Sequence, residues 1–289
     1  MGDPAFWILQ TLNAVQFSLL LFLMSVGLTV IFGLLHFVNL AHGSLYMMGA
    51  FVGVSIATTT GSYWIAFALA PVVVMAIGAA LYLGLIRRQR RSSPMNQVLI
   101  TFGLVFIFLD VARIFWGDIA LGLEVPAALA GSVHILSVDY PAYRLFTIGL
   151  GLIVLIALTY VLDGTGIGAM IRASVENETM AAAIGINAER LFFVIFCIGC
   201  ALAGLAGVVA APIFSAATGM GIAMLVPTLI VVVIGGLGSL KGAIAGAFTV
   251  GFVETFGAAI IPDFASVLVY VLLAAILIFR PSGLIPARG

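Results

Sequence analysis

Three charged side chains interrupt apolar runs of the sequence, where an ionisable group can do chemistry. Glu254 lies near the middle of one run, and Asp110 and Arg113 lie in another. A charge inside a membrane-spanning helix is costly, so such a group usually faces a cavity, a partner or an ion path. Asp110 and Arg113 are three residues apart on one helix face, which favours a structural salt bridge. Glu254 has no such neighbour, and three interpretations stay open: a protonated interior group, the partner of a distant polar group, or part of a translocation path.

Uncharged polar residues mark two further places. Gln10, Asn13 and Gln16 recur every three residues, so they form a stripe on one side of a helix that faces a neighbouring helix or a watery path. A sharper break separates two apolar stretches at His36–Ser44, which reads HFVNLAHGS. Irregular backbone at membrane depth is tolerated only where protein or a cavity covers it.

Within this break, Asn39, His42 and Gly43 are candidates for a translocation path. The free N–H groups at the ends of half-helices can hold an anionic carboxylate. An ordinary short cytoplasmic turn explains the same residues, and both interpretations stay open.

Enzyme and cofactor motifs fail on their spacing. The segment GGLGSLKG at Gly235–Gly242 lacks the Gly-Lys-Ser/Thr ending of a phosphate-binding loop, so the chain should not hydrolyse ATP itself. Its Gly242 and Gly246 form a GxxxG pair that favours close helix approach. The three histidines have no metal-ligand spacing and no catalytic triad can be assembled, so we predict no metal, no cofactor and no enzymatic activity. Cys197 and Cys200 lie in an apolar run, which favours two packed thiols over a disulfide framework.

The elements that position these residues follow from the composition. Of the 289 residues, 64% are hydrophobic and 8% are charged, and 11 basic residues balance 11 acidic ones. The mean hydropathy is +1.31. Soluble domains carry about a quarter charged residues, so this composition excludes a soluble globular enzyme, a disordered tail and a nucleic-acid binder. The sequence predicts an all-α, polytopic transmembrane helical bundle that forms a single domain over residues 1–289.

The apolar runs are long enough to cross a membrane. A hydrocarbon core about 30 Å thick needs about 20 apolar residues in a helix. On this basis we predict about eight or nine membrane spans. The candidate segments are Phe6–Leu35, Leu40–Thr60, Trp64–Ile86, Met95–Trp116, Ala142–Leu162, Leu191–Phe214, Met220–Gly238, Gly242–Ile261 and Phe264–Phe279.

The basic residues orient this bundle. With the arginine-rich loop Arg87–Arg91 in the cytoplasm, most basic residues fall on the inner face, as the positive-inside rule expects. Arg113 and Arg144 lie near the outer face. The N-terminus is therefore predicted outside and the C-terminus in the cytoplasm. The basic residues assigned to the inner face are Arg87, Arg88, Arg90, Arg91, Arg172, Arg190, Lys241, Arg280 and Arg288.

Two predicted loops are too long to be simple turns. The outer loop, Gly117–Pro141, resembles a short extracytoplasmic cap. The inner loop, residues 163–190, contains a helix-favouring run from Ala169 to Ile184, which Gly185 and Asn187 close. A helix in a cytoplasmic loop that is too polar to span can contact a cytosolic partner. An amphipathic helix lying on the membrane surface is the alternative.

Three segments carry a family resemblance, and it extends over nearly the whole chain. They are Gly27–Phe51 (GLTVIFGLLHFVNLAHGSLYMMGAF), Ile171–Asn187 (IRASVENETMAAAIGIN) and Val231–Ala247 (VVVIGGLGSLKGAIAGA). In this order they resemble the permease subunit of high-affinity branched-chain amino acid ABC importers.

The resemblance implies a multi-pass permease of the bacterial inner (plasma) membrane, in contact with membrane lipid. It implies three kinds of protein partner: a second permease subunit in a hetero- or homodimer, two cytosolic ATPase subunits, and a periplasmic substrate-binding protein. The inner loop would dock into the ATPases through Glu178, Ala182 and Gly185, with Arg172 as a further polar contact. The match to the Glu-Ala-Ala-x-x-x-Gly signature of other importers is loose, because Glu178 lies three residues before the run of alanines.

The implied function is ATP-driven import of leucine, isoleucine or valine by alternating access, in which this chain performs no covalent chemistry. The translocation path would include Asn39, His42, Gly43 and Glu254. Two alternatives stay open. The same architecture resembles permeases for urea, short amides or other amino acids, and an ion-coupled secondary transporter would use Glu254 or Asp110 as its coupling group.

Overall fold

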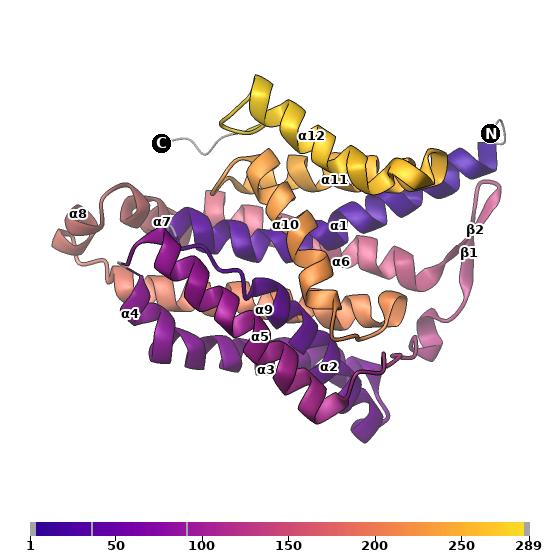
Figure 1. The fold of residues 1–289 in the computed structure, drawn as a ribbon, viewed down its shortest axis with the longest axis horizontal. Helices are drawn as coiled ribbons and strands as arrows, with labels where there is room; N and C mark the ends of the chain where they lie inside the picture. Colours follow the sequence, from indigo (N-terminus) through magenta and orange to yellow (C-terminus); the bar gives the residue numbers. More distant parts are fainter. Residues whose placement is uncertain (1–3, 36, 91, 286–289) are drawn as a thin grey trace.

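The computed structural model describes residues 4–35, 37–90 and 92–285. Nearly all of this part is helical, which confirms the predicted all-α bundle (Figure 1). His36, Arg91 and Arg288 lie outside the described residues. The α-helices are α1 Pro4–Leu35, α2 His42–Thr60, α3 Tyr63–Leu81, α4 Arg87–Gln89, α5 Pro94–Trp116, α6 Ala142–Gly164, α7 Gly166–Glu176, α8 Glu178–Ala183, α9 Ala188–Phe214, α10 Met220–Gly235, α11 Leu240–Ile260 and α12 Ala265–Phe279. A π-helical turn, η1 (Tyr82–Ile86), joins α3 to α4, and two 3₁₀ turns are η2 (Ala127–Leu129) and η3 (Pro262–Phe264).

Each of the nine predicted segments coincides with a helix, although not all of these helices are long or apolar enough to cross a membrane alone. Within the described part of the chain, six helices meet that length and hydropathy requirement. Helices α10 and α12 are shorter apolar helices, so the number of crossings and the orientation of the termini stay predictions. The six are Pro4–Gly33, Tyr63–Gln89, Pro94–Trp116, Ala142–Gly164, Ala188–Phe214 and Leu240–Ile260.

Several helices begin where the sequence supplies a capping side chain. The Ser93 hydroxyl accepts a hydrogen bond from the Asn96 amide at 3.4 Å, and Pro94 occupies the first turn of α5, where its missing N–H costs nothing. Ser239 caps α11 in the same way, at 3.0 Å from the Gly242 amide. These caps fix where the two helices start.

Two groups of three helices pack against each other in a reciprocal way. Helix α1 lies along α11, and α9 lies along α3, while α1 and α9 also contact each other. Helix α2 packs on α3 as α10 packs on α11, and α2 contacts α10. Helix α2 also packs closely along α9, so the two groups share one core.

Glycines allow the helix backbones to approach closely. Gly49 of α2 faces Gly204 of α9, so a Cβ at Gly49 would lie 2.5 Å from the Gly204 Cα. Gly235 of α10 faces Gly242 of α11 in the same manner, and Gly246 faces the end of α10. This confirms the close approach predicted from the GxxxG pair, because small residues at a helix contact replace side chains by backbone.

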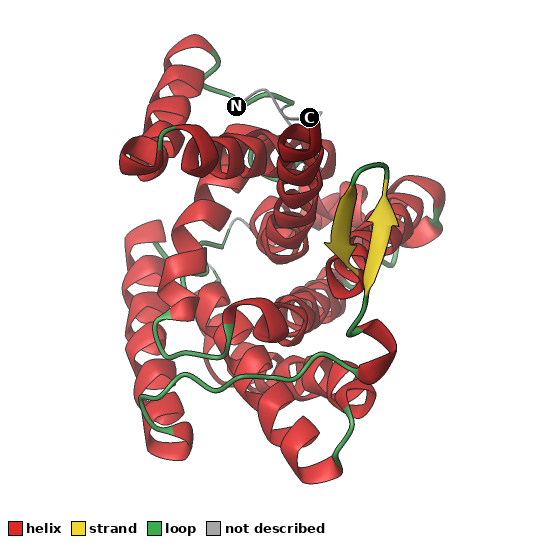
Figure 2. Cartoon of the chain, turned by 90° about the vertical axis from the view of Figure 1, so that its right-hand side faces the viewer, coloured by secondary structure: helices red, strands yellow, loops and turns green. Residues whose placement is uncertain are grey.

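The two ends of the bundle differ. Helices α4, α7 and α8 gather at one end, while the start of α1 and a β-hairpin lie at the other (Figure 1). The hairpin consists of β1 (Ser132–Ile135) and β2 (Val138–Pro141), antiparallel with His134 opposite Asp139. Figure 2 shows it standing beside helices seen nearly end-on. It belongs to the loop predicted as an outer cap, which also forms an isolated β-bridge between Leu121 and Ala216.

Candidate functional site

The inner loop forms two helices rather than one. Asn177 has an extended backbone (φ −155°, ψ 98°), and its side-chain oxygen accepts a hydrogen bond from the Met180 amide at 2.9 Å. Asn177 therefore ends α7 and caps α8, because this side chain competes with the helix backbone for the amide. The prediction of a single helix over Ala169–Ile184 is wrong at this residue. Gly185, with φ +89°, stops α8 as predicted.

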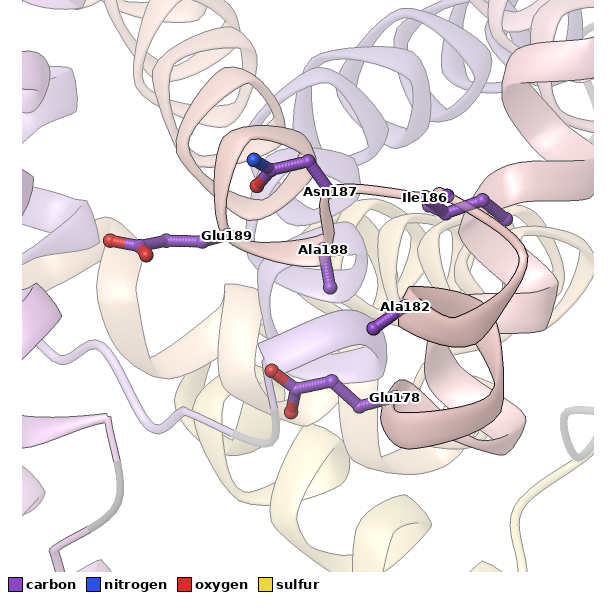
Figure 3. A pocket seen from close by; sticks show the side chains of 7 residues that line it. Glu178, Ala182, Ile186, Asn187, Ala188 and Glu189 are labelled. Carbon is purple, nitrogen blue, oxygen red and sulfur yellow. The ribbon is translucent and has the colours of Figure 1, made fainter.

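Helix α8 and the start of α9 line a shallow, open hollow of about 390 Å³. Glu178, Ala182 and Gly185, three of the four predicted coupling residues, line it (Figure 3). Glu189 of α9 also lines the hollow, and its carboxylate points away from Glu178 and Ala182 (Figure 3). The fourth residue, Arg172, lies elsewhere: its Nη1 donates to the Leu162 carbonyl near the end of α6. Arg172 therefore ties α7 to α6, where a cation satisfies a helix carbonyl. The other residues lining the hollow are Ile186, Asn187 and Ala188.

Two arginines pair with glutamates that line this hollow: Arg87, the first residue of α4, and Arg90, the residue after α4. Arg90 Nη2 lies 2.6 Å from Glu178 Oε2, and the Arg90 guanidinium also sits 3.9 Å from the centre of the Phe192 ring. Arg87 forms an ion pair with Glu189. These partners were not predicted, since Arg90 and Glu178 are 88 residues apart in the sequence. The only available signal was the excess of arginines in a loop predicted to lie on the same face.

Helix α8 also presents two large apolar side chains. Met180 is 66% exposed and Ile184 is 75% exposed. They are four residues apart, so they lie on one side of the segment. Met180 is two residues from Glu178 and from Ala182, so this apolar pair lies on the side of the segment opposite the residues that line the hollow.

The break after α1 turns back into the bundle. His42, the first residue of α2, is fully buried, and its Nε2 lies 3.0 Å from the Met24 carbonyl. Met24 precedes the end of α1 at Leu35 by 11 residues, or about 16 Å along the helix. Asn39 is also buried, and its carbonyl accepts from the His42 amide. This geometry favours a broken helix inside the bundle over a surface turn.

A second helix begins inside the bundle next to the first. The chain leaves α9 at Ser215, a non-glycine residue with φ +62°, and α10 starts at Met220. A Cβ at Gly221 would lie 2.8 Å from the Gly43 carbonyl oxygen, so the first turns of α2 and α10 are in backbone contact. Neither helix has a side-chain cap at its first turn. Gly43 is thus placed at the crossing of two uncapped helix N-termini.

The buried chain between α1 and α2 is held by two polar side chains of α5. Gln97 Oε1 accepts from the Val38 amide at 3.3 Å. Thr101 Oγ1 lies 3.4 Å from the Val38 carbonyl, although its closest acceptor is the Gln97 carbonyl at 2.8 Å. The buried Val38 amide is therefore paired with a side chain, as backbone at this depth requires. Sequence reasoning did not single out Gln97 or Thr101, because they lie in an otherwise apolar predicted span.

Glu254 does not join the residues of this break. It lies on α11, where Gly251, one turn earlier, faces Ser18 of α1. Ser18 is six residues from Met24, or about 9 Å along α1, so Glu254 and His42 occupy different levels of the bundle. Within the described chain, Glu254 Oε2 is buried without a hydrogen-bond partner, as is the Ser18 hydroxyl. The four predicted path residues therefore form two separate polar places.

The remaining polar predictions have structural partners. Arg113 Nη1 lies 3.7 Å from Asp110, which confirms that pair, and Arg113 Nε lies 3.0 Å from Asp118. Asn13 accepts from Arg144 Nη1 at 2.7 Å and from Tyr140 Oη at 3.2 Å, so this part of the stripe faces protein.

The side chains of Tyr140, Gln16, Cys197 and Cys200 are buried, with no disulfide and no metal-binding group of residues in the described part of the chain. Burial raises the pKa of the Tyr140 phenol. Gln16, another member of the stripe, is buried, and its Nε2 has no partner within the described residues. Cys197 and Cys200 are free thiols in the core. No group of three or more residues able to hold a metal ion occurs in the part of the chain that the structure describes.

A family model described as branched-chain amino acid transport system / permease component matches residues 10–278. The chain belongs to this permease family. It is 27% identical to the high-affinity branched-chain amino acid transport system permease protein BraD of Pseudomonas aeruginosa, covering 99% of this chain and 97% of that protein. It is 25% identical to the permease protein LivH of Escherichia coli K12, covering 97% and 96%. The family predicted from the sequence is thus confirmed, and these permease components are not enzymes.

A solved structure shares the fold of this permease. It is PsaBC from Streptococcus pneumoniae in complex with Fab, with a TM-score of 0.50, 18% sequence identity, and coverage of 92% of this chain and 89% of the other. At this identity the likeness concerns the fold alone. The chain is accordingly a multi-pass membrane permease component with apolar helices arranged around two broken segments.

Proposed function

We propose that this permease is a transmembrane subunit of an ATP-driven importer that carries leucine, isoleucine or valine across the bacterial inner membrane. The names of its relatives support the cargo class. The scarcity of fixed charge suits a zwitterion with an apolar side chain, since a charged path would hold water and ions instead.

The observation that carries the proposal is the geometry of α8. The six-residue helix α8 lies outside the predicted spans and is fixed by Asn177 at its start and by Gly185 after its end. Met180 in this helix and Ile184 directly after it are exposed on the side away from the hollow. Apolar anchors on a short helix suit insertion into a groove of another protein. We assign this groove to the cytosolic ATPases, so that residues 163–190 form the coupling loop.

The predicted coupling residues receive distinct roles in this proposal. Glu178, Ala182 and Gly185 shape the docking surface, because small residues let a partner approach the helix closely. Arg172 connects movement of α7 to α6, since its side chain donates a hydrogen bond to a carbonyl near the end of α6. Movement of the docked segment would thereby reach a long helix of the bundle.

The proposed path includes the crossing of α2 and α10. Helix N-termini carry partial positive charge and free N–H groups, which suit the carboxylate of an amino acid. Asn39, His42 and Gly43 belong to this crossing. Glu254, on α11, lies beside an earlier part of α1, where its carboxylate suits the ammonium group of the same cargo as it moves. Alternating access would then open the crossing to one side at a time.

The assembly proposed here has four kinds of member besides membrane lipid: this chain, a second permease as hetero- or homodimer, two ATPase subunits, and a periplasmic binding protein. Purification of the tagged chain should bring the ATPases and the second permease with it. In proteoliposomes, labelled leucine should enter only with the complete complex and ATP, whereas urea should not compete. Competition by urea or a short amide would show that the permease carries that class of compound instead of branched-chain amino acids. Uptake by this chain alone under an ion gradient would contradict the proposal.

A further inference from the structure

Gln97 of α5 joins two segments that are far apart in sequence. Its side chain is 3% exposed. Nε2 donates to the Ser92 carbonyl at 3.2 Å and lies 3.4 Å from the Arg90 carbonyl, while Oε1 accepts from the Val38 amide at 3.3 Å. One buried amide therefore bridges the loop after α4 and the broken segment before α2.

On the loop side, the connection continues to α8. Arg90, whose carbonyl Gln97 contacts, pairs through its side chain with Glu178 at 2.6 Å and covers the Phe192 ring. The Arg90 side chain is 15% exposed, so this pair is better shielded from solvent than an ordinary surface ion pair. Glu178 is therefore connected, through the side chain of Arg90, to the loop whose carbonyl groups contact Gln97.

On the membrane side, the connection continues to the crossing. Val38 stands four residues before His42, and its carbonyl lies 3.4 Å from the Thr101 hydroxyl. Residues 37–39 have no regular secondary structure, and the Val38 amide depends on the Gln97 side chain for its hydrogen bond. Because Oε1 and Nε2 of Gln97 are both used in a buried place, the loop cannot move alone without leaving a polar group unpaired.

We propose that Gln97 is a positioning residue that transmits movement of α8 to the broken segment at Val38–His42. This inference rests on the proposed function, since it requires α8 to be driven by an ATPase. Without the hydrogen bonds of Gln97, α8 would move while the first turns of α2 and α10 keep their positions. ATP hydrolysis would then continue without the passage of substrate.

The test compares Gln97→Met with Asn96→Leu in the assembled complex. Methionine matches glutamine in length and removes the polar contacts of both Oε1 and Nε2. Asn96, the residue before Gln97 in α5, is exposed, so Asn96→Leu serves as the control. The measurement is leucine taken up per ATP hydrolysed in proteoliposomes. We expect Gln97→Met to lower this ratio by at least about fivefold, the lower end of coupling between sites, while Asn96→Leu leaves it unchanged. Partial misfolding lowers uptake and hydrolysis together, so it does not move the ratio.

A double-mutant cycle tests whether the connection is continuous. If Glu178 acts through Gln97, Glu178→Gln should add little to the loss of ratio in Gln97→Met. Thr101→Val, which keeps the shape of the side chain, should lower the ratio less than Gln97→Met because Gln97 remains. Fully additive effects, or a Gln97→Met ratio equal to that of Asn96→Leu, would overturn the inference alone. Absence of ATP-dependent uptake by the wild-type complex would overturn the proposed function and the inference with it.

Discussion

Replacing Gly221 by alanine tests whether the first turns of α2 and α10 are in backbone contact. The new Cβ would lie 2.8 Å from the Gly43 carbonyl oxygen, where ordinary contact begins at 3.4 Å. The helices must therefore separate by about 0.6 Å or bend, because the obstacle is backbone and not the end of a flexible side chain. Overpacking of this kind costs about 1–3 kcal/mol.

The matched control is Gly103→Ala in α5, where a Cβ meets nothing within 4 Å. Both variants gain up to about 1 kcal/mol in helix propensity, so the difference between them isolates the overpacking. For a difference of about 2 kcal/mol, the melting temperature of Gly221→Ala should lie about 4–8 °C below that of Gly103→Ala. Gly43→Ala should fall at least as far, since its Cβ would approach the Gly221 carbonyl more closely still.

The chain carries its own reporter for this experiment. Cys197 and Cys200 are buried free thiols, so a thiol-reactive fluorophore labels them as the detergent-solubilised protein unfolds. Equal melting temperatures for Gly221→Ala and Gly103→Ala would refute the backbone contact. Without this contact, the first turns of α2 and α10 would no longer form the proposed site on the translocation path.

Three further predictions concern charged groups and the coupling loop. Glu178→Gln and Gly185→Val should each lower the ATPase activity stimulated by loaded binding protein by at least about fivefold. The free energy of unfolding should fall by no more than about 2 kcal/mol, because the Glu178 ion pair is partly exposed and the strain of valine at φ +89° is of this size. Unchanged stimulation would remove these residues from coupling. The Glu254→Gln variant should have the melting temperature of the wild-type protein but take up less leucine. Normal uptake would show that Glu254 only packs within the bundle. Asp110→Asn should change the free energy of unfolding by less than about 1 kcal/mol and leave uptake unchanged, because its partner Arg113 also pairs elsewhere and the group is exposed; a larger loss would show a role beyond this surface pair.

The helices could be predicted from the sequence because they follow from length and hydropathy alone. The segment Ala142–Leu162, for example, becomes α6 Ala142–Gly164, since about 20 apolar residues with no internal break favour one helix. The break at Asn177 was missed although its signal is present. Asparagine followed by glutamate is a typical helix start, and the composition of the surrounding run concealed it.

The candidate site could be predicted only in part, because its residues meet through the fold. Glu178, Ala182 and Gly185 lie close together in sequence and were found together in space. The pairing of Glu178 with Arg90 and the bridge from Gln97 to Val38 join residues 88 and 59 positions apart. No local pattern marks such partners, since they depend on which helices pack side by side. The inward turn of the chain before His42 depends on the same packing.

The central claim is that this permease moves its cargo only when ATPases drive it through α8. The most direct measurement is uptake of labelled leucine into proteoliposomes that contain the complete complex, with wild-type chain or Glu178→Gln, with and without ATP. We expect uptake that requires ATP and the binding protein and that falls in Glu178→Gln. Leucine uptake by vesicles containing this chain without ATPases, driven by an ion gradient, would contradict it.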